Sequence, residues 1–83
     1  MLTIKVLGSG CKNCKQLAWL VEHAVTHLGI EAHIIKETDY AEIMRYGILS
    51  TPGLVINEKL VTAGRIPSEA EIATLLASAL ETA

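Results

Sequence analysis

The chain has 83 residues, 51% hydrophobic and 19% charged, which suits a single globular domain and excludes an intrinsically disordered chain. Seven lysines and arginines against nine aspartates and glutamates give a net charge of −2, so the chain lacks the basic stripe that binding a nucleic-acid backbone requires. Because it also lacks an apolar run of membrane-spanning length and a signal peptide, we expect a cytoplasmic protein without nucleic-acid or membrane partners.

The apolar run Leu2–Leu7 predicts a buried strand, and the apolar spacing of residues 15–28 predicts a helix that Gly29 ends. Trp19 falls on the polar face of this helix, where it is either half covered by neighbours or in contact with a partner. The apolar face consists of Leu17, Ala18, Val21, Ala24, Val25 and Leu28. The polar face carries Lys15, Trp19, Glu22, His23 and Thr26.

A second strand is predicted over residues 31–36, which completes a β-α-β unit with parallel strands and a right-handed crossover. A short helix over residues 40–46 follows, with Thr38 or Asp39 as its cap and Gly47 at its end.

The C-terminal part of the chain predicts a hairpin and a helix. Residues 54–56 and Lys59–Ala63 form the arms of the hairpin, with Asn57-Glu58 as its turn. Ser68-Glu69-Ala70-Glu71 is a capping box, which predicts the start of the last helix. The order is therefore β-α-β-α-β-β-α, in one domain over residues 1–83. The apolar face of the last helix consists of Ile72, Leu75, Leu76, Ala79 and Leu80.

The two cysteines of the chain, Cys11 and Cys14, form a C-x-x-C pattern between the first strand and the first helix. A disulfide that closes so short a loop stabilises the fold very little. In a reducing compartment the pattern therefore favours a redox-active or metal-binding pair of cysteines. The flanking Gly10 and the polar pair Lys12-Asn13 indicate that Cys11 is exposed, which argues against two inert core cysteines.

Metal binding is the main alternative for these cysteines. Small copper-transfer domains also carry C-x-x-C between a strand and a helix, and their two thiolates hold a soft ion. Those domains have the order β-α-β-β-α-β and end on a strand, whereas this chain ends on a capped helix.

A zinc site of Cys11, Cys14, His23 and His27 would have the spacing C-x2-C-x8-H-x3-H. On one helix, however, Cys14 and His23 are separated by roughly 13 Å of rise, while zinc ligands converge to about 2 Å from the metal. We therefore interpret the two histidines as part of a solvated face and predict no metal site.

With this order of elements, the residues resemble the thioredoxin and glutaredoxin superfamily, most closely its small thioredoxin-like redox-active disulfide proteins. The resemblance rests on residues 10–14 after the first strand, Thr51-Pro52-Gly53 before the third, Gly64 after the fourth, and the amphipathic last helix. It implies an α/β thioredoxin-like fold, a four-stranded mixed sheet flanked by helices, with a cis Thr51–Pro52 bond facing the cysteines.

The resemblance also implies a dithiol–disulfide oxidoreductase that reduces protein disulfides and is itself returned to the dithiol by an upstream reductant. Cys11 at the helix N-terminus would be the attacking thiol and Cys14, one turn later, the resolving thiol. The redox-active disulfide would be the only redox group, so no cofactor is expected, and we favour a monomer. The substrate edge would consist of Thr51, Pro52 and Gly53, bordered by Gly64 and Arg65, with Gly10, Lys12 and Asn13 supporting Cys11.

Three positions differ from the patterns of this superfamily. Lys12-Asn13 is neither the Gly-Pro of thioredoxins nor the Pro-Tyr of many glutaredoxins. Lys5 stands where thioredoxins carry a buried acid on the strand that precedes the cysteines. Residues 63–68 replace the Gly-Gly-x-Asp-Asp-like segment with which glutaredoxins bind glutathione. Neither the proton relay of a thioredoxin nor the glutathione clamp of a glutaredoxin is complete.

Overall fold

The computed structural model of the chain describes residues 2–8, 10–48 and 50–82. Within them, the predicted order β-α-β-α-β-β-α is confirmed, and α1 begins three residues earlier than its apolar spacing indicated. No helix of these residues has both the length and the apolar character needed to cross a membrane. The elements are β1 (Leu2–Leu7), α1 (Lys12–Leu28), β2 (Ala32–Glu37), α2 (Tyr40–Met44), β3 (Gly53–Ile56), β4 (Lys59–Ala63) and α3 (Glu69–Thr82).

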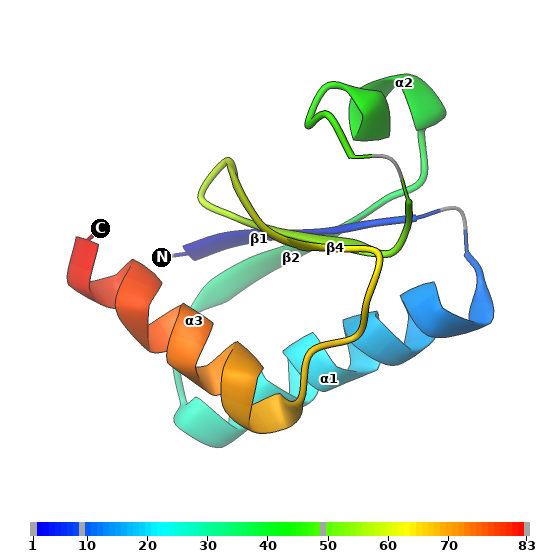
Figure 1. Ribbon diagram of the computed structural model, residues 1–83. Helices are drawn as coiled ribbons and strands as arrows, with labels where there is room; N and C mark the ends of the chain where they lie inside the picture. The colour runs from blue at the N-terminus through cyan, green and yellow to red at the C-terminus, as the bar shows by residue number, and fades with distance from the viewer. Residues whose placement is uncertain (1, 9, 49, 83) are drawn as a thin grey trace.

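The four strands form one mixed sheet in the order β2-β1-β3-β4. Strand β1 is parallel to β2 and antiparallel to β3, and β3 and β4 form the predicted antiparallel hairpin. Helices α1 and α3 cover one face of the sheet, whereas α2 lies on the other face (Figure 1). The predicted four-stranded mixed sheet with flanking helices is therefore confirmed.

Side chains of β1 alternate between two apolar clusters, because successive residues of a strand point to opposite faces. Leu2, Ile4 and Val6 pack with α1 and α3, and Leu7 packs with Ile43 on the α2 side. Two residues of the predicted helix faces are exposed, since Leu28 and Leu80 have exposed fractions of 42% and 45%. Each lies at the C-terminal end of its helix, beyond the last residue of that helix in the larger cluster.

The helix ends follow the predicted chemistry with two changes. Helix α2 was predicted to reach residue 46 and to end at Gly47, but it ends at Met44, and Gly47 lies in the turn beyond it. The Asp39 side chain accepts from the Ala41 amide at 2.9 Å and caps α2, and Gly29 ends α1 in the left-handed conformation. The Ser68 hydroxyl accepts from the Glu71 amide at 3.1 Å. The Glu71 carboxylate, predicted to complete a capping box, contacts the Arg65 guanidinium, because that cation offers it a charge-assisted pair.

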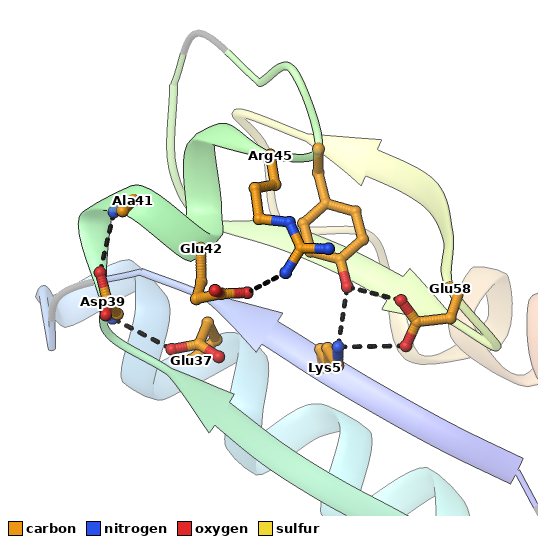
Figure 2. Close-up of polar contacts among 8 residues, drawn as sticks. Lys5, Glu37, Asp39, Ala41, Glu42, Arg45 and Glu58 are labelled. Carbon is orange, nitrogen blue, oxygen red and sulfur yellow. Dashed lines mark hydrogen bonds and ion pairs between the residues drawn. The ribbon is translucent and has the colours of Figure 1, made fainter.

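A polar cluster joins β1 to the β3–β4 turn (Figure 2). The Lys5 ammonium donates to the Tyr46 hydroxyl at 2.8 Å and forms an ion pair with the Glu58 carboxylate at 3.1 Å. The Tyr46 hydroxyl also donates to Glu58 at 2.9 Å. Hydrogen bonds to Tyr46 and Glu58 raise the pKa of Lys5, and hydrogen bonds from Lys5 and Tyr46 lower the pKa of Glu58.

Glu58→Gln is expected to lower the free energy of unfolding at neutral pH. Folding lowers the pKa of Glu58. The carboxylate therefore contributes to the free energy of unfolding above its ordinary pKa of 4.5, and this contribution is lost as the pH falls through its pKa in the folded protein. In urea unfolding, the difference between wild type and variant should therefore shrink between about pH 7 and pH 3. Glu31→Gln is the control, since Glu31 is exposed and makes no ion pair among the described residues; an equal, pH-independent loss in both variants would contradict the assignment.

Candidate active site

Cys11 and Cys14 lie where β1 passes into α1, and they form a disulfide with a Cα–Cα distance of 5.0 Å. Cys11 is the N-cap of α1, in an extended conformation, and its Sγ accepts from the Cys14 amide at 3.1 Å. Cys11 is exposed, whereas Cys14 is only 5% exposed and packs on the buried side of the helix. One sulfur is therefore open to a second molecule and the other is covered.

The surroundings of Cys11 favour a negative charge on its sulfur. The first turn of α1 has no acidic residue, and its free amides and aligned peptide dipoles point toward Cys11. Lys12 begins the helix and Lys15 lies in the same turn, so two cations flank the cap. A thiol in such a position ionises more readily than a free cysteine.

Gly8, directly after β1, lets the backbone pass close to the buried sulfur of Cys14, because glycine has no Cβ. A Cβ at Gly8 would overlap Cys14 Sγ and stand 3.0 Å from Cys14 Cβ. The same Cβ would lie 3.8 Å from Thr51 Cβ, so Gly8 sits between the second cysteine and the Thr51–Pro52 segment. The sequence analysis did not select Gly8; its one signal was a glycine at the end of a buried strand next to C-x-x-C.

The predicted substrate edge is built around a cis Thr51–Pro52 bond, with Thr51 exposed and Pro52 buried. Gly53 begins β3 and pairs with Leu7 of β1. The Gly64 amide donates to the Pro52 carbonyl at 2.8 Å, which holds the end of β4 against this segment. The structure thus brings residues 51–53 and Gly64 to the end of the sheet that carries the cysteines.

The remaining predicted residues lie around this edge. Gly64 has φ +75°, a conformation that favours glycine, and a Cβ there would displace the Ser50 hydroxyl. Arg65 faces Glu71 of α3, donating at 3.1 Å through Nη1, and this pairing lowers the pKa of Glu71. Its contact with a substrate stays a prediction. Gly10 (φ +84°), Lys12 and Asn13 are all exposed beside Cys11.

A groove of about 270 Å³ opens beside Cys14 between α1 and the end of β2. Trp19 lines it and is 59% exposed, with Lys36 and Thr38 on the opposite side. Lys5 does not reach this region, because its side chain lies with Tyr46 on the α2 side of the sheet. Among the described residues, no group of three or more histidine, cysteine or carboxylate side chains is arranged to hold a metal.

An exposed and a buried cysteine at a β1–α1 junction, joined as a disulfide beside a cis-proline segment, define a dithiol–disulfide oxidoreductase of thioredoxin-like fold. Residues 2–77 match the family model described as a thioredoxin domain. The chain belongs to the thioredoxin family.

Two curated relatives carry the name thioredoxin. The protein of Methanocaldococcus jannaschii is 42% identical over 98% of this chain and 93% of its own. That of Methanothermobacter thermautotrophicus is 36% identical over 92% of this chain and 99% of its own. Both matches cover more than nine tenths of the relative's own length.

Solved thioredoxin structures share the fold at low sequence identity. A malaria-parasite thioredoxin-2 superposes with a TM-score of 0.69 at 12% identity, over 94% of this chain and 82% of its own. The germline-specific thioredoxin Deadhead of Drosophila melanogaster gives a TM-score of 0.66 at 18% identity, over 93% of this chain and 79% of its own.

Proposed function

We propose that the reduced chain transfers two electrons to disulfides in protein partners, with Cys11 as the attacking thiolate and Cys14 as the resolving thiol. The observation that supports this most directly is the position of Cys11 Sγ, exposed at the N-cap of α1 and 3.1 Å from the Cys14 amide. A helix N-terminus stabilises the thiolate, which is the nucleophile in thiol–disulfide exchange.

In the first step, the Cys11 thiolate attacks one sulfur of the substrate disulfide. The substrate S–S bond breaks, a mixed disulfide with Cys11 forms, and the departing substrate thiolate takes a proton from solvent. In the second step, Cys14 loses its proton and attacks Cys11. The intermolecular bond breaks, the substrate leaves as its second thiolate, and the Cys11–Cys14 disulfide remains until an upstream thiol reductant reduces it.

Burial of Cys14 supports the proposed order of these steps. Its sulfur is covered by the Gly8 backbone and the inner side of α1, so an external disulfide meets Cys11 first. Cys14 reaches Cys11 within the same turn, which makes the second attack intramolecular.

We place the substrate chain along Thr51, with Pro52 and Gly53 behind it and Gly64 and Arg65 at its border. Thr51 is exposed directly before the buried Pro52, so an extended peptide can approach this residue. Main-chain hydrogen bonds of this kind accept many sequences, since they do not depend on the side chains of the peptide.

The function is tested by following insulin reduction with dithiothreitol as the electron source. Turnover by the wild type, above the rate of dithiothreitol alone, is the expected result.

Equilibrium dialysis of the reduced protein with Cu(I) and Zn²⁺ tests the metal-binding alternative. Tight one-to-one binding that is lost on oxidation, without insulin reduction, would favour a thiolate metal carrier over the oxidoreductase proposed here.

In the reduced protein, the pKa of Cys11 is expected to lie clearly below that of a free thiol, about 8.5. The Cys14 amide, the helix dipole and the two neighbouring lysines all stabilise the thiolate. The rate of iodoacetamide alkylation against pH measures this value, with Cys14→Ser used so that one thiol reacts. A midpoint at or above that of free cysteine would contradict the role of the helix terminus.

A further inference from the structure

Three aromatic side chains stack along the exposed face of α1, at four-residue spacing. The Trp19 and His23 rings lie 5.0 Å apart between centroids, and His23 and His27 lie 6.4 Å apart. Both pairs of ring planes deviate by only 13° from parallel. Residues four apart on a helix are surface neighbours, so the two imidazole rings lie next to each other on the exposed side of α1.

A contact from α3 leaves the Nε2 atom of His23 free to bind a metal ion. His23 Nδ1 lies 2.8 Å from Glu69 Oε1, and a carboxylate can only accept, so Nδ1 carries the proton. The lone pair of a neutral ring is then on Nε2, directed away from Glu69. Metal-ligating histidines have this arrangement, in which the second ring nitrogen donates to a carboxylate and fixes the tautomer.

We propose that His23 and His27 form a two-histidine chelating site for a divalent cation of the Cu²⁺, Ni²⁺ or Zn²⁺ class, with Glu69 as the carboxylate behind His23. Histidines at i and i+4 on one helix face can share a metal ion. Imidazole suits these cations, and Cu²⁺ binds most tightly in the series.

Sharing one ion requires the His27 ring to turn toward His23. With a metal–nitrogen bond of about 2.0–2.1 Å, each ring centroid stands roughly 3.2 Å from the metal, so two rings that bind at about 90–110° to each other are roughly 4.5–5.2 Å apart. The observed 6.4 Å is longer, and rotation of the exposed His27 side chain has to close the difference when the ion binds. Water completes the coordination, since this side of α1 is open to solvent.

This site is separate from the redox pair. Cys14 precedes His23 by nine residues on α1, or roughly 13 Å of rise, so the sulfurs and the imidazoles do not share an ion. Binding is therefore expected in the oxidised protein, in which neither cysteine carries a free thiol.

Trp19 provides the readout, because it is the only tryptophan of the chain and stacks on His23. Untagged, oxidised protein is titrated with Cu²⁺, whose paramagnetism quenches nearby indole fluorescence. We expect saturable quenching that excess Zn²⁺ reverses. His27→Gln is expected to weaken binding tenfold or more, because the second ligand of a chelate binds intramolecularly. Glu69→Gln is expected to weaken it by about tenfold.

His33→Gln is the matched control, since His33 is an exposed histidine on β2 away from this face. Unchanged Cu²⁺ affinity in His33→Gln, with the loss in His27→Gln, supports the site. Equal affinity of wild type and His27→Gln, or an equal loss in His33→Gln, overturns it. As a second measurement, Zn²⁺ should raise the melting temperature of the wild type and not of His27→Gln, because a ligand bound only to the folded state stabilises it.

Discussion

Cys11→Ser is expected to reduce the rate of insulin reduction by about three orders of magnitude or more, because the variant loses the nucleophile of the first step and the sulfur that Cys14 attacks in the second. Cys14→Ser is expected to stop the reaction one step later, with the substrate held on Cys11 as a mixed disulfide. Non-reducing gels with a disulfide-containing protein substrate distinguish the two variants, since only Cys14→Ser should give the adduct.

The wild type is the control for this trapping, because its Cys14 releases the substrate within the same turn of α1. Equal adduct formation by the two serine variants would contradict the assigned order of attack. Adducts from Cys11→Ser alone would reverse the roles of the two cysteines. Either result would also contradict the inference that burial of Cys14 decides which sulfur meets the substrate.

The second large effect is expected from Gly8→Ala. The added methyl group would overlap Cys14 Sγ, and neither the end of β1 nor the start of α1 can yield freely, because Val6 and Leu17 hold them in the buried core. Overpacking of this kind costs about 1–3 kcal/mol of folding free energy. Since the displaced sulfur is the resolving one, the mixed disulfide on Cys11 should also persist longer than in the wild type.

Gly10→Ala is the control for this effect. Gly10 has φ +84°, so alanine is strained there and the variant also loses stability, but its Cβ meets nothing within 4 Å. Comparison of the two variants by urea unfolding and by quenched-flow detection of the mixed disulfide separates backbone strain from displacement of Cys14. A mixed disulfide that decays in Gly8→Ala as fast as in Gly10→Ala would contradict the role given to Gly8.

Local patterns predicted most of the fold. Apolar alternation located β1, and the spacing of Leu17 and Val21 gave the inner face of α1. The apolar spacing begins only at residue 15, three residues after the start of α1, because the first turn follows the Cys11 cap and carries polar residues that no hydrophobic periodicity reveals. The exposure of Leu28 and Leu80 could not be predicted either, since periodicity does not say where the covering sheet ends.

Contacts between distant parts of the chain were beyond the sequence analysis. Nothing in the local pattern connects Lys5 with Glu58, or His23 with Glu69. The two cysteines and the Thr51–Pro52 segment were selected by motif, yet the glycine that lies between them was not. Pairings of this kind depend on the crossover and register of the strands, which one sequence specifies only through the complete fold.

The sulfur that caps α1 also influences the reduction potential of the protein. A cap that stabilises the Cys11 thiolate stabilises the reduced chain over the oxidised one, and this shifts the reduction potential toward less negative values. The hydrogen bond that hastens attack by Cys11 therefore also makes the dithiol a weaker donor. Substitutions in the first turn of α1 should change reactivity and driving force in opposite directions, so this turn sets the balance between them.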